Sequence, residues 1–132
     1  KEVFRTEHPV VTFAGSGTLA MEAAVAGVLS PGDRILTLEA GKFGQRWGGI
    51  ARAFGVEVIA LEETWGRSIE PEAVELALAK NPGVKAVYGT LCETSTAVLN
   101  DVERIGEIVG KTDAIYVVDA VSGLAADRLE TD

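Results

Sequence analysis

The sequence has 132 residues, 47% apolar and 24% charged, which is enough for one domain with a hydrophobic core and too few for two. The formal net charge of −8 argues against nucleic acid and anionic membrane surfaces as partners. No apolar run approaches the roughly 20 residues of a membrane-spanning helix. The single cysteine excludes an internal disulfide and is consistent with a reducing, cytoplasmic setting.

The first half of the chain alternates strand and helix patterns. A β-branched run at Pro9–Phe13 predicts a strand, and the alanine-rich segment Thr18–Leu29 predicts a helix. A second strand is expected at Arg34–Leu38, followed by a glycine-rich loop and a helix over about Gln45–Phe54. That helix is expected to end at Gly55, because glycine tolerates the left-handed conformation that commonly follows a helix.

The second half of the chain continues this alternation. Pro71 suits the first turn of a helix over Pro71–Lys80, and a polar loop is expected over Thr90–Asn100. Asn100, with Glu103 three residues further on, resembles a capping box at the start of another helix. The remaining strands are expected at Val56–Leu61, Val84–Gly89 and Ala114–Asp119.

Strands that alternate with helices at this spacing predict an α/β fold in three layers, α/β/α, with a mostly parallel sheet. In such sheets ligands bind beyond the carboxyl ends of the strands. The segments expected there are small, polar or rich in glycine: Ala14–Thr18, Glu39–Gly44, Thr90–Thr96 and Asp119–Gly123. We expect them to meet at one rim of the sheet.

The turn "GSGT" (Gly15–Thr18) follows a predicted strand and opens a predicted helix. The free N–H groups and partial positive charge at a helix start suit a phosphate, and glycine lets the backbone approach it closely. A simple turn in which Ser16 or Thr18 caps the helix explains the same residues. The spacing of "GSGTLA" also fits a dinucleotide-binding fold, in which Glu39 is the expected acid.

Three further residues at this rim have both a structural and a functional interpretation. Phe43 either packs against the following helix or stacks on a planar ligand, and Thr94 either satisfies a turn or faces a ligand. Asp119 caps the turn after its strand, holds a metal or meets a cation on a ligand, because an unpaired buried carboxylate is costly. His8, the only histidine, and Cys92 have no catalytic partner nearby in sequence, and no Cys/His cluster indicates a metal.

Four motifs in order along the chain resemble those of a known family. They are "GSGTLAMEAA", "LSPGDRILTLEAGKFGQRW", "CETSTAVLND" and "YVVDAVSGLAAD", and together they span nearly the whole sequence. This series resembles the class V aminotransferases, which use pyridoxal phosphate. It is most similar to the alanine–glyoxylate and serine–pyruvate aminotransferases and to proteins called soluble hydrogenase small subunit. The resemblance implies the large domain of the fold-type I pyridoxal-phosphate-dependent transferases.

The resemblance also implies a role for individual residues. The cofactor-binding set that it implies is Ser16, Gly17, Thr18, Phe43, Thr94, Asp119 and Val121. Within this set the "GSGT" turn holds the phosphate, while Phe43 and Val121 pack on opposite faces of the pyridine ring. Asp119 pairs with the pyridine nitrogen and keeps it protonated, which strengthens the ring as an electron sink.

The implied reaction transfers an amino group from a small amino acid, serine or alanine, to a 2-oxo acid, glyoxylate or pyruvate, in a homodimer. The lysine that forms the Schiff base is expected a few dozen residues after Asp119, where this chain has none. We therefore expect residues 1–132 to be the central part of one large domain, inactive alone, without its N-terminal segment, lysine-bearing segment and C-terminal small domain. The alternatives are a desulfurase or lyase of the same cofactor fold, a Rossmann-type dinucleotide-binding domain, and a non-catalytic interaction module.

Overall fold

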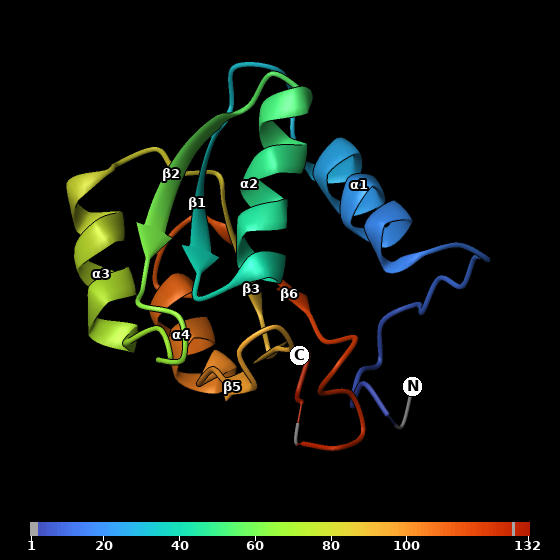
Figure 1. Cartoon of the computed structure of the whole chain (residues 1–132). Coiled ribbons are helices and arrows are strands. Elements are labelled where there is room, and N and C mark those ends of the chain that lie inside the picture. Colours follow the sequence, from blue (N-terminus) through green and yellow to red (C-terminus); the bar gives the residue numbers. More distant parts are fainter. Residues whose placement is uncertain (1–2, 128) are drawn as a thin grey trace.

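The central sheet of the computed structural model, which describes residues 3–127 and 129–132, contains four parallel strands in the order β2–β1–β3–β6 (Figure 1). The strands are β1 (Arg34–Glu39), β2 (Glu57–Glu62), β3 (Ala86–Thr90) and β6 (Ile115–Asp119). β1 pairs with β2 on one side and with β3 on the other. The chain therefore reverses its direction across the sheet between β1 and β3, which creates a crevice where their carboxyl ends diverge.

Helices cover both faces of this sheet, so the three-layer α/β/α prediction is confirmed. The helices are α1 (Gly17–Val28), α2 (Lys42–Ala53), α3 (Pro71–Lys80) and α4 (Val102–Val109). α1 and α2 lie on one face, and α3 and α4 lie on the other (Figure 1). As predicted, Pro71 is in the first turn of α3, and Gly55 follows α2 with φ +75°.

Each face of the sheet contributes to a separate hydrophobic core. Between the sheet and α1 and α2, Trp47 packs with a tilted ring against Tyr88, with 4.8 Å between ring centroids. The Trp47 indole N–H donates to the carbonyl of Gly89 at 3.2 Å, so its one polar atom is paired in the core. On the opposite face the core is aliphatic and includes Leu36, Val74, Val87, Ile105 and Val109.

The strand predicted at Pro9–Phe13 is wrong. This segment has no regular secondary structure, and Val11 and Phe13 are 79% and 52% exposed. A β-branched run forms a strand only where a neighbouring strand supplies hydrogen bonds and a packing surface. In the structure Pro9–Phe13 pairs with no strand of the described sheets, so its intrinsic preference alone does not make it a strand.

The polar loop predicted over Thr90–Asn100 contains a short antiparallel hairpin. Its strands are β4 (Cys92–Glu93) and β5 (Val98–Leu99). The N-cap predicted at Asn100 is also wrong, because Asp101 is the N-cap of α4 and its side chain accepts the N–H of Arg104.

Asn100 instead has a buried role that ties three segments together. Its side-chain oxygen accepts the N–H of Ile69 at 3.0 Å, and its amide nitrogen donates to the carbonyl of Thr90 at 3.0 Å. The residue is 6% exposed, so water does not replace these partners if they are lost. A local capping pattern therefore pointed to a residue whose partners are distant in sequence.

Replacing Asn100 with alanine is expected to lower the free energy of unfolding by about 2 kcal/mol, because a buried N–H and a buried carbonyl lose their partners. Urea unfolding of the chain measures this. The matched control is Asn81→Ala, whose half-buried amide makes one bond to the carbonyl of Ala77 and is expected to cost about 0.5–1 kcal/mol. Equal losses in the two variants would contradict a special role for Asn100.

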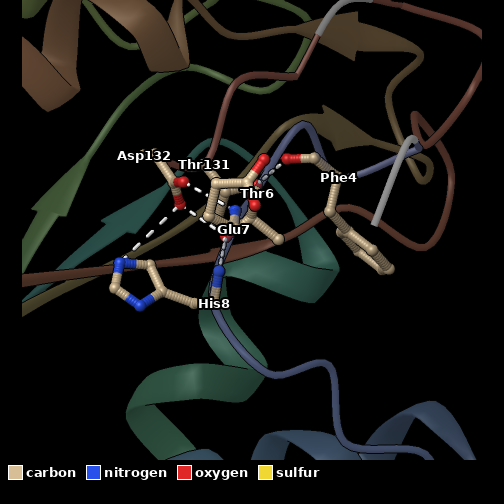
Figure 2. Close-up of polar contacts among 6 residues, drawn as sticks. All are labelled: Phe4, Thr6, Glu7, His8, Thr131 and Asp132. Carbon is tan, nitrogen blue, oxygen red and sulfur yellow. Dashed lines mark hydrogen bonds and ion pairs between the residues drawn. The ribbon is translucent and has the colours of Figure 1, made fainter.

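The two terminal segments of the described chain lie side by side. Figure 2 shows that the N–H of Glu7 donates to the carboxylate of Asp132 at 2.9 Å and that the hydroxyl of Thr131 donates to the carbonyl of Phe4. His8 is exposed and its Nε2 lies 4.0 Å from the same Asp132 carboxylate. The only histidine of the sequence is therefore in the terminal contact and not at the carboxyl ends of the strands. Across residues 3–127 and 129–132, no helix is both long enough and apolar enough to cross a membrane.

Candidate functional site

The segments beyond the carboxyl ends of β1, β3 and β6 meet the start of α1 around one cavity of about 310 Å³. All seven predicted site residues line it: Ser16, Gly17, Thr18, Phe43, Thr94, Asp119 and Val121. Met21, Arg46, Cys92 and Ser122 complete the lining. The volume lies at the lower end of the range for small-molecule sites. The structure thus brings the predicted residues together, while their roles toward a ligand stay predictions.

The amino terminus of α1 forms one wall of this cavity. Ser16 is the N-cap, and its hydroxyl and carbonyl oxygens accept the N–H groups of Leu19 and Ala20. The N–H groups of Gly17 and Thr18 come earlier in the first turn, where a helix offers no acceptor of its own. A Cβ added to Gly17 would point across the cavity, 3.8 Å from Val121. That contact is an ordinary van der Waals distance, and the backbone N–H groups of the first turn line a cradle that suits an anion.

Phe43 forms a second wall, on the first turn of α2 and not on the loop predicted before a helix at Gln45. The helix begins at Lys42, three residues earlier than expected. The guanidinium of Arg46 lies over the Phe43 ring at 4.9 Å from its centroid, and one of its nitrogens donates to the Thr18 hydroxyl at 3.4 Å. Arg46 therefore links the aromatic wall to the anion cradle and adds a positive charge to the cavity.

Asp119 and Val121 form the wall that follows β6. Asp119 is half-buried at the end of the strand, and its Oδ1 accepts the N–H of Val121 at 2.9 Å. The carboxylate therefore caps its turn with one oxygen, while the residue also lines the cavity. Val121 is 76% exposed, so its side chain is accessible at the cavity.

Thr94 and Ser122 close the remaining side of the cavity. Their hydroxyls are hydrogen-bonded to each other, which joins the hairpin after β3 to the turn after β6. Cys92, two residues before Thr94, lines the same cavity and is partly buried. Among the described residues no group of three or more His, Cys, Asp or Glu side chains is placed to hold a metal ion.

Glu93 lies between Cys92 and Thr94 but faces the opposite way, and no sequence motif singled it out. Its buried carboxylate accepts the N–H groups of Phe43 and Gly44 at the start of α2. Gly41, the N-cap of that helix, has no side chain to supply an acceptor. A helix whose own cap lacks a side-chain acceptor was the available signal that an acceptor comes from elsewhere.

Two features argue against the dinucleotide-binding alternative. Glu39, its expected acid, is buried, accepts the hydroxyl of Thr37 at 2.7 Å and lies beneath α2 at Gly48, outside the cavity lining. The dinucleotide motif also requires a strand of the sheet before its glycine turn, and residues 3–14, the described part of the chain ahead of this turn, contain none.

A larger cavity, of about 820 Å³, lies between α1, α4 and the edge strand β6. It shares Gly17, Met21, Asp119 and Val121 with the smaller cavity, and its lining includes the terminal segments. Size alone does not define a ligand site, whereas convergent polar groups do. We therefore place the candidate site in the smaller cavity, where the helix amino terminus, Arg46 and the hydroxyl groups converge.

The fold and the cavity together define a doubly wound α/β domain with a candidate ligand site at the carboxyl ends of a parallel sheet. The family model for class V aminotransferases matches residues 1–132, and the chain belongs to this family. The family resemblance seen in the sequence is thereby confirmed, and so is the fold class.

Individual relatives agree with this assignment. An uncharacterized aminotransferase of Methanocaldococcus jannaschii is 42% identical over 132 residues, which are 100% of this chain and 34% of that protein. The serine–glyoxylate aminotransferase of Methylorubrum extorquens is 33% identical over 137 residues, covering 100% of this chain and 34% of that protein. The crystal structure of alanine–glyoxylate aminotransferase from a Nostoc species matches with a TM-score of 0.91 at 31% identity, over 97% of this chain and 34% of that one. The chain spans about a third of the length of these relatives.

Proposed function

We propose that this chain is the central part of the cofactor-binding domain of a pyridoxal-phosphate-dependent aminotransferase. The observation that carries the proposal is the convergence of all seven predicted cofactor contacts on one cavity. The complete protein would transfer an amino group from a small amino acid, such as serine or alanine, to a 2-oxo acid, such as glyoxylate or pyruvate. The substrate class rests on similarity to serine–glyoxylate and alanine–glyoxylate aminotransferases.

The residues around the cavity fit the parts of this cofactor. The N–H groups of Gly17 and Thr18, with the positive charge of Arg46, suit its phosphate. Phe43 and Val121 supply the two walls between which a flat ring would lie. The bound cofactor would supply an electron sink for the carbanion formed when an amino acid loses its α-proton.

Asp119 would then provide the negative charge that keeps the ring nitrogen protonated. Its Oδ1 is held by the N–H of Val121, so the carboxylate has a fixed position at the cavity. A fixed charge near the reacting system stabilises developing charge without the cost of reorganising solvent. This gives the half-buried carboxylate a partner as well as a turn to cap.

The catalytic lysine is proposed to come from a segment of the complete protein outside this chain. None of the described lysines, Lys42, Lys80, Lys85 and Lys111, lines the cavity. We therefore expect the chain alone to be inactive in transamination. The same proposal includes a homodimer, on the family resemblance, and a cytoplasmic location, because a single unpaired cysteine is consistent with a reducing compartment.

Cys92 provides a direct test of where the cofactor binds. In the cofactor-free complete protein, pyridoxal phosphate at about ten times its dissociation constant is expected to slow alkylation of Cys92 by iodoacetamide roughly tenfold, because bound ligand covers the cavity. Mass spectrometry of the peptide that contains Cys92 measures the rate. NAD at the same concentration is the control and is expected to leave the rate unchanged. Protection by NAD and not by pyridoxal phosphate would overturn the proposal in favour of a dinucleotide site.

A further inference from the structure

Glu93 is a fully buried carboxylate, 0% exposed, that lies behind the cavity wall and is absent from its lining. Its position follows from strand geometry, because successive side chains of β4 point to opposite sides. Cys92 and Thr94 face the cavity, so Glu93 between them faces the amino terminus of α2.

The contacts of Glu93 are those of a helix cap supplied from a distant segment. Oε2 accepts the N–H of Phe43 at 3.1 Å and the N–H of Gly44 at 2.9 Å. Oε1 accepts the Ser95 hydroxyl at 2.5 Å, and the Ser95 Oγ in turn accepts the N–H of Lys42 at 2.9 Å. The first three N–H groups of α2 are therefore satisfied by the hairpin that follows β3, and the helix dipole stabilises the buried negative charge.

The start of α2 packs closely against the Glu93 side chain. A Cβ added to Gly41 would lie 2.6 Å from Cγ of Glu93 and 2.6 Å from Oγ of Ser95. The backbone at the start of α2 thus passes directly over the Glu93 side chain. The contact fixes α2 and the hairpin relative to each other at the point where each supplies a cavity residue, Phe43 from the helix and Thr94 from the hairpin.

We propose that Glu93 is a positioning residue of the cofactor site. It holds Phe43 in place for stacking on the cofactor ring and fixes the position of Thr94 relative to Phe43. The inference rests on the proposed function. A cap that served only helix stability would need no particular relation to the cavity. Here the capped residue, Phe43, and the residue next to the cap, Thr94, are both cavity walls.

The test uses the complete protein and compares Glu93→Gln, Phe43→Ala and the double variant. Glu93→Gln preserves the shape of the side chain but turns an N–H₂ group toward backbone donors. The dissociation constant for pyridoxal phosphate is expected to rise roughly tenfold in Glu93→Gln, with weaker visible circular dichroism per bound cofactor. The double variant is expected to bind no more than about twofold more weakly than Phe43→Ala, because both changes remove the same contact.

All measurements are made at a temperature at which far-ultraviolet circular dichroism shows each variant to be folded. Glu62→Gln, which neutralises an exposed carboxylate at the end of β2, is the control and is expected to bind as the parent does. If Glu93→Gln does not fold, Ser95→Ala takes its place in the test. It removes one hydrogen-bond partner of Glu93 and is expected to raise the dissociation constant for pyridoxal phosphate about threefold.

The outcomes for the positioning role of Glu93 and for the proposed function can be told apart. Additive losses in the double variant, or unchanged binding and circular dichroism in Glu93→Gln, would overturn the positioning role while leaving the proposed function in place. Parent protein that binds no pyridoxal phosphate would overturn the proposed function, and the inference with it. Loss in Glu93→Gln that disappears in the Phe43→Ala background supports the inference.

Discussion

Replacing Asp119 with asparagine is expected to lower kcat/KM for transamination by the complete protein roughly a hundredfold or more, with little change in stability. On the proposed function, the loss follows from the removal of a fixed negative charge that would lie beside the ring nitrogen, where preorganised electrostatic groups typically contribute this much. Steady-state kinetics with serine or alanine as donor and glyoxylate as acceptor measures it.

The asparagine variant separates the two interpretations of Asp119. The Val121 N–H donates to Oδ1, and an asparagine side chain offers an Oδ1 acceptor at the same place. The turn after β6 therefore keeps its hydrogen bond, and only the charge is lost. A residue that merely caps this turn would tolerate the change, with a free energy of unfolding within about 0.5 kcal/mol of the parent and unaltered activity.

Two further variants complete this experiment. Asp119→Ala removes both the charge and the turn acceptor, and is expected to lose activity to a similar extent while also losing about 1 kcal/mol of stability. Asp113→Asn neutralises an exposed aspartate just before β6 and is expected to leave kcat/KM unchanged. Full activity in Asp119→Asn would show that the carboxylate does not act on the cofactor.

The parallel sheet and its ligand rim were predictable because their signals are local. Strand and helix patterns repeat with their own periods, and the connection rules place the carboxyl ends of parallel strands at one edge. Asp119 ends a predicted strand, and Phe43 and Thr94 lie five residues beyond two others, so this part of the rim could be named from the sequence. The "GSGT" turn was placed there by the strand predicted at Pro9–Phe13, which does not form, and it reaches the rim as the start of α1. Their convergence on one cavity follows from the topology.

The predictions that were wrong, and the role that was missed, concern residues whose partners are distant in sequence. Pro9–Phe13 has a strand composition but no strand beside it in the sheet, and Asn100 has a capping pattern but bonds Ile69 and Thr90 instead. Glu93 bonds residues about fifty positions away, so no window of sequence around it shows its role. Long-range pairing of this kind is fixed by tertiary packing, which overrides local preference.

Replacing Gly44 with alanine is expected to lower the free energy of unfolding of the chain by about 3 kcal/mol. The added Cβ would lie 2.4 Å from the carbonyl oxygen of Leu38 and 2.9 Å from Cα of Glu39. Both are backbone atoms of a buried strand, so the helix must move away from β1. The same movement would pull the Gly44 N–H from the Glu93 carboxylate, which it meets at 2.9 Å.

Gly49→Ala is the matched control in the same helix. A Cβ at Gly49 meets nothing within 4 Å, so the substitution is expected to stabilise the chain by about 0.5–1 kcal/mol through helix propensity alone. Urea unfolding with a common slope measures both variants, and the two effects are expected to have opposite signs. Comparing the same glycine-to-alanine change at two positions of one helix thereby separates the contact between α2 and β1 from the general preference of helices for alanine.

The result for Gly44 bears on the site as well as on stability. The close approach of α2 to the end of β1 brings the first turn of the helix within reach of Glu93, and it is in this turn that Phe43 enters the cavity. If Gly44→Ala unfolds like the parent, the helix does not approach β1 this closely, and the bond from Gly44 to Glu93 loses its geometric basis. If it destabilises as expected while Gly49→Ala stabilises, then glycine is required at position 44 because β1 lies against it, and the aromatic wall of the cavity depends on that contact.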